Sequence, residues 1–269
     1  MLPEAVRGFW YRLGEAGGRT RRTAWGFVRA DARYPLLHEA NMAAVLEEWA
    51  GLQPEDVRSA LLPLLEEAGA SHDHVEFWAS QASPAVRALR AEGWGEAHDA
   101  LMGWEGGRPT LPSGPVVVRE VSESEPGFLP WYRASRHDFG EQALAPAVVD
   151  QLLGRHLEVL RPLGLRWFVG FLDGEMAGLA SLVSLDGVRY VDSVVTAPRF
   201  RRRGVATATV LRTVRESLAT GDRTLHLLAV EGGKPQRLYE RLGFRVWGRV
   251  VTFNRPRLLA PAPGTGGSS

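Results

Sequence analysis

The stretch Val194–Thr207, VVTAPRFRRRGVAT, decides the fold of the second half of this chain. A β-rich run ends at Pro198, four arginines crowd the turn that follows, and a helix is expected to begin at Gly204. The first N–H groups of a helix have no partner within it, and the macrodipole adds about half a positive charge there. Gly204 permits close approach of the backbone, and Ala206 is too small to block it. The pattern therefore predicts an anion cradle that suits a pyrophosphate.

The cradle matches neither of two common nucleotide-binding motifs, because the sequence contains no G-x-x-x-x-G-K-[ST] and no G-x-G-x-x-G. An arginine-flanked helix start on an ordinary surface remains the alternative. Among 32 basic residues only Lys234 is a lysine, which together with the many alanines and glycines indicates a GC-rich coding bias. The abundance of arginine is therefore not by itself evidence for phosphate binding.

Segments with a period of two residues alternate with segments of period 3.6 around this stretch. The dipeptides Asp173-Gly174 and Asp186-Gly187 predict hairpin turns in the middle of the region. The expected fold is therefore an α/β domain with a mixed sheet. We expect strands over 116–121, 166–172, 176–185, 190–196, 224–230 and 245–252, and helices over 128–139, 146–160, 204–219 and 235–242.

Two motifs carry a resemblance to a known family. Arg201–Ala206, RRRGVA, resembles the Arg/Gln-x-x-Gly-x-Gly/Ala loop of the GCN5-related N-acetyltransferases (GNAT), which holds the coenzyme A pyrophosphate. Leu238–Phe244, LYERLGF, is similar to the family's second signature, at the end of the helix after the fifth strand. The resemblance covers about Val116 to Arg255. It implies an α/β (α+β) fold with a mixed, mostly antiparallel central sheet flanked by helices, and transfer of an acyl group from acetyl-CoA, or another acyl-CoA, to an amine.

The resemblance also implies where the coenzyme binds. The fourth strand, here Val191–Thr196, splays from the fifth, and the pantetheine arm lies in the gap. The family often carries an asparagine seven residues before its tyrosine, where this chain has Gly232. Either backbone contacts or Lys234 replace that side chain, or the coenzyme binds more weakly. The expected coenzyme-binding residues are Val194, Val195, Thr196, Arg201, Arg202, Arg203, Gly204, Val205, Ala206, Thr207 and Lys234.

Direct acyl transfer needs a base for the ammonium, a donor to the thioester carbonyl and an acid for the leaving thiolate. It needs no covalent intermediate, which agrees with the absence of cysteine. The resemblance assigns the acid to Tyr239, whose alternative role is packing on an amphipathic helix. A backbone N–H near Val195 or Thr196 is the simplest donor to the carbonyl.

The base is less well specified by the sequence. Asp192 has the same strand parity as Val194 and Thr196, so its carboxylate is the first candidate, with a salt bridge at the rim as the alternative role. Glu231, just past the fifth strand, is the second candidate. His226 within that strand is the third, although a lone strand histidine more often packs in a core.

The first 105 residues repeat the pattern of the rear half in a shortened and diverged form. Aligning Gly93-Trp94 with Gly243-Phe244 superimposes the order strand, helix, Gly-aromatic, strand, which predicts a shortened copy of the same fold. Leu89 then replaces Tyr239, and the acidic turn Gly51–Asp56 replaces the basic loop, so this lobe should bind no coenzyme. It should instead pack on the rear lobe, and whether it walls the acceptor site stays open. The expected division is 1–105 for the degenerate lobe, 106–115 for a Gly/Pro-rich linker, 116–257 for the acetyltransferase domain and 258–269 for a disordered tail.

Composition excludes several other classes of protein. Without cysteine among 269 residues, the chain has no disulfide, thiolate zinc site, iron–sulfur cluster or cysteine nucleophile. His72-Asp73-His74 has no further ligand nearby in sequence and is expected to be a solvated turn, so no metal is predicted. The formal charge of +1 gives no general attraction to nucleic acid or anionic membrane, and no apolar run is long enough to span one. A cytoplasmic protein is expected.

We therefore expect a tandem acetyltransferase that is active in its rear half and acetylates a primary amine of a small molecule or a protein. The alternative is a non-catalytic acyl-CoA-binding or regulatory module, which Gly232 and the weakly specified base favour. An arginine-rich nucleic-acid binder is disfavoured by the near-zero net charge. The sequence does not indicate the acceptor or the oligomeric state.

Overall fold

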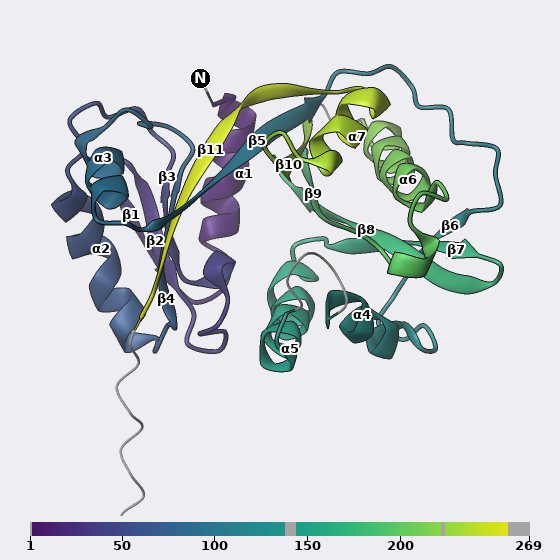
Figure 1. Ribbon diagram of the computed structural model, residues 1–269, viewed down its shortest axis with the longest axis horizontal. Helices are drawn as coiled ribbons and strands as arrows, with labels where there is room; N and C mark the ends of the chain where they lie inside the picture. Colours follow the sequence, from purple (N-terminus) through teal and green to yellow (C-terminus); the bar gives the residue numbers. More distant parts are fainter. Residues whose placement is uncertain (1, 138–143, 222–223, 258–269) are drawn as a thin grey trace, which may run out of the picture.

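The computed structural model describes residues 2–137, 144–221 and 224–257 (Figure 1). The front half contains α1 (Glu4–Gly14), β1 (Arg19–Thr23), β2 (Gly26–Ala30), η1 (His38–Ala40), β3 (Met42–Val45), α2 (Pro54–Glu67), β4 (His72–Phe77), α3 (Pro84–Ala91) and β5 (Gly95–Trp104). The rear half contains β6 (Val117–Val121), α4 (Phe128–His137), α5 (Pro146–Arg155), the π-helical η2 (His156–Leu160), β7 (Arg166–Leu172), β8 (Glu175–Leu185), β9 (Val188–Thr196), η3 (Pro198–Phe200), α6 (Val205–Ala219), β10 (Thr224–Val230), α7 (Lys234–Leu242) and β11 (Phe244–Pro256).

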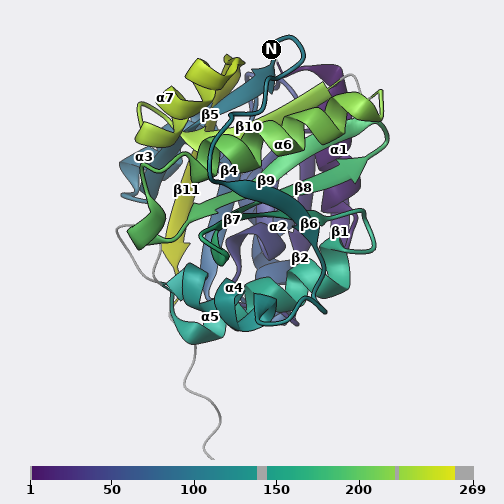
Figure 2. The same ribbon diagram turned by 90° about the vertical axis from the view of Figure 1, so that its right-hand side faces the viewer.

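The described strands form one eleven-stranded sheet in the order β1-β2-β3-β4-β11-β5-β10-β9-β8-β7-β6. Only the β3–β4 and β9–β10 pairs are parallel. In the rear half, α6 and α7 cover one face of the sheet, and α4 and α5 lie on the other (Figure 2). The expected mixed, mostly antiparallel sheet flanked by helices is confirmed.

The two halves exchange their last strands. β5 of the front half pairs with β10 of the rear half, while β11 of the rear half pairs with β4 of the front half and with β5 (Figure 1). The element order β-β-β-α-β-α-β occurs once in each half, and the glycines that end α3 and α7, Gly93 and Gly243, both have a positive φ, of 75° and 117°. The boundaries at 105 and 116 stay a prediction, because the sheet runs through both halves without a break.

Local signals in the sequence predicted most elements of the rear half. Asp173 and Gly174 have φ of 53° and 81°, and Asp186 and Gly187 have φ of 49° and 76°, as hairpin turns with two left-handed residues require. The helix expected over 146–160 continues as a π-helix after Arg155, and the last strand extends to Pro256. The end of the helix expected over 128–139 and the tail 258–269 lie outside the described residues.

The solvated turn expected at His72-Asp73-His74 is wrong. These residues open β4 and are only 5%, 2% and 5% exposed. Asp73 accepts hydrogen bonds from Arg255 and Arg257, which the exchanged strand β11 brings alongside β4. Burial of the carboxylate therefore depends on a strand that the local sequence does not reveal. No group of His, Asp and Glu side chains suited to a metal ion occurs among the described residues.

The exchange also joins the cores of the two halves. Phe9 and Trp10 of α1 pack against Tyr190 of β9 and His226 of β10, with ring centroids 5.1–6.2 Å apart.

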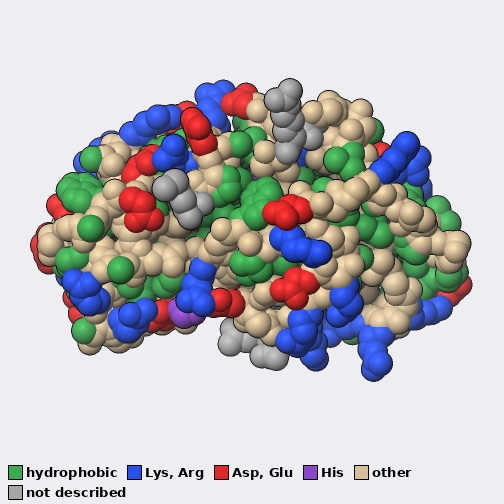
Figure 3. All heavy atoms as spheres, turned by 90° about the horizontal axis from the view of Figure 1, so that it is seen from above, with side chains coloured by type: hydrophobic (Ala, Val, Ile, Leu, Met, Phe, Trp, Pro, Cys, Tyr) green, Lys and Arg blue, Asp and Glu red, His purple; other side chains and the backbone are tan. Residues whose placement is uncertain are grey.

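Seen from above, basic and acidic side chains are interspersed over the face that Figure 3 presents. Within the described ranges, no helix has the length and apolar character needed to cross a bilayer.

Candidate active site

A cavity of about 510 Å³ opens at the start of α6, between α6, α7 and the end of β9; we call it the α6 cavity. It gathers most of the residues expected to bind the coenzyme. Val195 and Arg203 are not among them: Val195 packs in the core, and Arg203 reaches Asp173 at 3.1 Å. The lining consists of Val194, Thr196, Arg201, Arg202, Gly204, Val205, Ala206, Thr207, Lys234, Pro235, Leu238, Tyr239 and Arg241.

The backbone at the start of α6 forms the cradle that the sequence indicated. Gly204 is the N-cap with φ 83° and ψ 0°, a conformation that favours glycine. The N–H of Ala208 bonds the Gly204 carbonyl at 2.9 Å, so the amides of 205–207 precede the first helical hydrogen bond. These amides and the helix dipole favour an anion at this end of the cavity.

The side chains around the α6 cavity also suit a phosphate-bearing ligand. Four cations line it, and no carboxylate stands among its lining residues. The Thr196 hydroxyl is buried and has no hydrogen-bond partner among the described residues. A buried hydroxyl without a partner costs free energy that a bound polar ligand would recover. The residues present therefore fit coenzyme A, with phosphates at the cations and a polar arm along β9.

The strands β9 and β10 separate beside this cavity. Their parallel pairing runs from Val188–Thr224 to Val191–Leu227 and stops there, although β9 continues to Thr196 and β10 to Val230. One backbone edge of β9 is therefore open toward the gap.

Asp192 is the extra residue of a β-bulge. Ser181 of β8 pairs with Ser193, but the next residue, Leu182, pairs with Val191, so Asp192 has no partner across the strand. A bulge redirects side chains and breaks the alternation of faces. The expectation that Asp192 shares a face with Val194 and Thr196 is therefore wrong: Asp192 lines a second cavity, on the other side of the sheet from α6.

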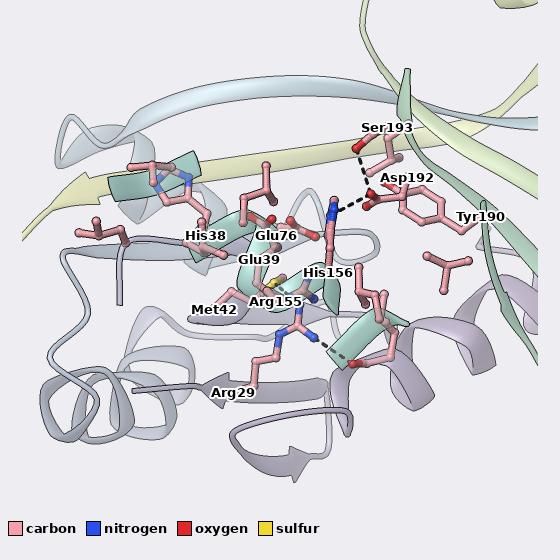
Figure 4. Close-up of a pocket in the computed structure, with 18 of the residues that line it drawn as sticks. Arg29, His38, Glu39, Met42, Glu76, Arg155, His156, Tyr190, Asp192 and Ser193 are labelled. Atoms are coloured by element: carbon pink, nitrogen blue, oxygen red, sulfur yellow. Dashed lines mark hydrogen bonds and ion pairs between the residues drawn. The ribbon is translucent and has the colours of Figure 1, made fainter. Parts of the chain in front are cut away.

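This second cavity has a volume of about 550 Å³ and lies between the two halves; we call it the interlobe cavity (Figure 4). The front half contributes side chains from α1, β2, η1, β3 and β4, including Arg29 and Glu76. The rear half contributes side chains from α4, α5, η2, β8, β9 and β10, including Arg155 and Asp192. The front lobe thus walls the cavity on this side of β9. Neighbouring residues of β9 line the two cavities, Asp192 and Ser193 the interlobe cavity and Val194 the α6 cavity.

The Asp192 carboxylate is held by one of its two oxygens. Oδ2 accepts hydrogen bonds from the hydroxyls of Ser181 at 3.2 Å and Ser193 at 3.0 Å, and Nε2 of His156 lies 3.4 Å away (Figure 4). Oδ1 has no such partner among the described residues. Burial raises the pKa of Asp192, but the hydrogen bond from His156 and the nearby arginines outweigh it and hold the pKa well below its usual range. Asp192 is therefore ionised at neutral pH, with one oxygen available to a ligand.

Tyr239 faces the α6 cavity from α7. Its side chain is 6% exposed and packs against Phe244, with ring centroids 5.9 Å apart. Burial raises the pKa of Tyr239 to about 12, so the hydroxyl keeps its proton at neutral pH. The residue thus presents a protonated hydroxyl at the edge of the cavity.

The other two candidate bases lie outside both cavities. The Glu231 carboxylate accepts a hydrogen bond from Arg249 at 2.9 Å and lies 3.5 Å from His98. His226 is fully buried, with the Phe9 ring 5.1 Å and the Tyr190 ring 5.2 Å away, and burial lowers its pKa to about 3. His226 is therefore a neutral core residue. Gly232 donates its N–H to Gln236 at 2.7 Å.

The sequence reasoning missed the residues around Asp192. His156 also bonds the Tyr132 hydroxyl through Nδ1 at 2.9 Å, so Tyr132, His156 and Asp192 form a buried chain of polar groups. One signal was available, since His156 lies three residues after Leu153 on the buried face of its helix. The bulge and the front-lobe Arg29 left no comparable signal.

The front lobe contains a different helix start. The carboxylate of Asp56 accepts the Gln53 N–H at 2.8 Å and caps α2, and Leu89, at the position of Tyr239, is buried. The front helix thus supplies its own negative charge where α6 has open amides.

Comparison with known proteins finds a family that most of the rear half resembles. Residues 128–244 match the model described as the acetyltransferase (GNAT) family. A search of curated proteins finds no match.

Solved structures extend the likeness to the whole chain. A conserved protein of unknown function from Staphylococcus epidermidis has a TM-score of 0.68 at 12% identity, covering 91% of this chain and 96% of its own. A GCN5-related N-acetyltransferase from Kribbella flavida has a TM-score of 0.63 at 18% identity, covering 96% and 97%. A tandem GNAT protein from the clavulanic acid biosynthesis pathway has a TM-score of 0.55 at 14% identity, covering 97% of both chains. At these identities the likeness concerns the fold alone.

Proposed function

Because residues 128–244 match the GNAT acetyltransferase family model, we propose that this chain transfers an acetyl group from acetyl-CoA to a primary amine by direct attack. Enzymes of this family use acetyl-CoA and act on amines. The observation that carries the proposal is that consecutive residues of β9 line both cavities, with Tyr239 lining the α6 cavity and Asp192 the interlobe cavity.

The α6 cavity is the proposed coenzyme site, and acetyl-CoA bound there supplies the activated acetyl group. The amides of 205–207 bind the diphosphate, with charge from Arg201, Arg202 and Lys234. The Thr196 hydroxyl and the open edge of β9 bind the pantetheine arm. These groups place the thioester where the strands separate.

The interlobe cavity is the proposed acceptor site. Oδ1 of Asp192 attracts the ammonium and accepts its proton as the nitrogen attacks the acetyl carbonyl. Ser181, Ser193 and His156 keep the carboxylate oriented through Oδ2. A backbone N–H near Val195 or Thr196 stabilises the negative charge on the carbonyl oxygen.

Tyr239 completes the transfer as a general acid. As the carbon–sulfur bond breaks, its hydroxyl gives a proton to the leaving sulfur, which its pKa of about 12 permits because the group is protonated beforehand. We also propose that residues 116–257 form the catalytic domain and that residues 1–105 form a lobe without a coenzyme site, consistent with the self-capped start of α2.

The test is CoA release from acetyl-CoA with a panel of amines, alongside calorimetry of acetyl-CoA binding. Tyr239→Phe should lower kcat on the order of 100-fold while leaving the affinity for acetyl-CoA within about threefold, because only the transferable proton is removed. Tight binding without turnover, unchanged by Tyr239→Phe, would instead identify a non-catalytic acyl-CoA-binding module.

A further inference from the structure

Three arginines line the interlobe cavity: Arg136 of α4, whose buried Nε and Nη2 have no hydrogen-bond partner among the described residues, and the more deeply buried Arg29 and Arg155. Arg29 of β2 is 3% exposed and Arg155 of α5 is 4% exposed, and both extend into the same part of the cavity (Figure 4). Across the described ranges, neither guanidinium has a carboxylate within 4 Å. They come from different halves of the chain, so the cavity exists only where the two lobes meet.

Neutral groups satisfy these guanidinium groups only in part. Arg29 donates to the Leu13 carbonyl at 3.0 Å and to the Glu39 carbonyl, but its buried Nε has no partner among the described residues. The Arg155 guanidinium, which lines the cavity, makes no hydrogen bond with another described residue. Burial, and after it the charge of Arg155, lowers the pKa of Arg29 to about 9. Since an arginine stays protonated at neutral pH, Arg29, Arg136 and Arg155 place three partly uncompensated positive charges in the cavity.

Carboxylates occupy other walls of the same cavity. Glu76 accepts hydrogen bonds from Trp78 at 2.9 Å and bonds His74 at 3.1 Å, and Glu39 also lines the space. Asp192 lines the cavity from β9, two residues before Val194 of the α6 cavity. The cavity therefore offers arginines to an anion and carboxylates to a cation, which is the charge pattern of a zwitterionic ligand.

We infer that the acceptor is a small amino carboxylate, such as a free amino acid, whose carboxylate is bound by Arg29 and Arg155 while its amine faces Asp192. This inference rests on the proposed acetyl transfer. A guanidinium fork matches the two oxygens of a carboxylate, and a cavity of about 550 Å³ is in the range of small-molecule sites. A lysine side chain of a protein would bring a cation alone and leave both arginines unpaired.

The experiment compares each free amino acid, and β-alanine, with its carboxamide as acetyl acceptor. The carboxamide keeps the amine and nearly the same size but removes the negative charge. We expect the best amino acid to exceed its amide at least tenfold in kcat/KM, because the amide leaves the buried guanidinium groups unpaired. Arg155→Met should lower kcat/KM for that amino acid on the order of 100-fold, remove the preference over the amide and leave acetyl-CoA affinity unchanged. Arg155→Lys should restore part of the preference.

Arg133→Met is the matched control: Arg133 of α4 forms an exposed ion pair with Asp150 of α5, and the variant should behave as the wild type. Calorimetry of the same amino acid and amide pairs in the presence of CoA measures the preference without turnover. A protein that binds acetyl-CoA and prefers amino acids but releases no CoA would contradict the proposed reaction and support this inference. Amides that match their acids, a preference that survives Arg155→Met, or a stronger preference for phosphate-bearing amines would overturn it.

Discussion

Asp192→Asn separates the proposed acceptor side from the coenzyme side most cleanly. All three donors to Asp192 reach Oδ2, so an asparagine that keeps its oxygen there would turn its NH2 group toward the amine. The substitution thus removes the base and its negative charge. It also places the NH2 group of asparagine, a hydrogen-bond donor, next to the ammonium of the acceptor, which is a donor too. General-base catalysis contributes about 10²–10⁴-fold, so kcat/KM should fall on the order of 1,000-fold, or about 4 kcal/mol in the barrier.

The assay is steady-state CoA release, paired with calorimetry of acetyl-CoA. Affinity for acetyl-CoA should stay within about threefold, because Asp192 does not line the α6 cavity. The pKa of Asp192 lies below the usual aspartate value of about 4, so its carboxylate stays ionised throughout the range from pH 5 to 8. The wild-type pH profile should therefore show no loss of rate from protonation of Asp192 in that range. Asp150→Asn, at the exposed pair with Arg133, is the control. Near-normal turnover of Asp192→Asn, or an equal loss of acetyl-CoA binding, would refute the reasoning.

Two further predictions concern the fold. Deleting residues 1–105 removes β5 from between β10 and β11 and leaves their edges unpaired. The remaining chain should therefore be largely insoluble, or unfolded by circular dichroism. A fragment that folds cooperatively and binds the coenzyme would contradict the strand exchange. Burial lowers the pKa of His72 and of His226 to about 3, so each stays neutral in the fold and protonates on unfolding below its usual value of about 6.5. Urea unfolding should therefore show the free energy of unfolding falling between pH 6.5 and pH 5, by up to about 2 kcal/mol for each histidine. His226→Leu should lose less stability over this range than the wild type. Identical losses would contradict the buried, neutral state of His226.

Features that depend on contiguous residues were predictable from the sequence. The cradle at the start of α6 needs only Gly204, the basic turn and the helix that follows, and the Asp-Gly hairpins need only their own two residues. These signals act over a few residues, so tertiary packing did not override them.

Features that depend on distant pairing were not predictable in this way. The partner that buries Asp73 comes from β11, and the lining of the interlobe cavity combines Arg29 with Arg155 across the two halves. The bulge at Asp192 is invisible to a period-two pattern, because an inserted residue changes every face assignment after it. The acceptor side of the site is therefore a property of the assembled sheet, whereas the coenzyme side is largely local.

The most direct test of the account is a crystal structure of the full chain with acetyl-CoA and the best amino acid amide or acid from the acceptor screen. The account predicts the diphosphate on the amides of 205–207, the sulfur beside the Tyr239 hydroxyl and the acceptor nitrogen beside Oδ1 of Asp192. A coenzyme bound in the front lobe, or an acceptor bound outside the interlobe cavity, would contradict it.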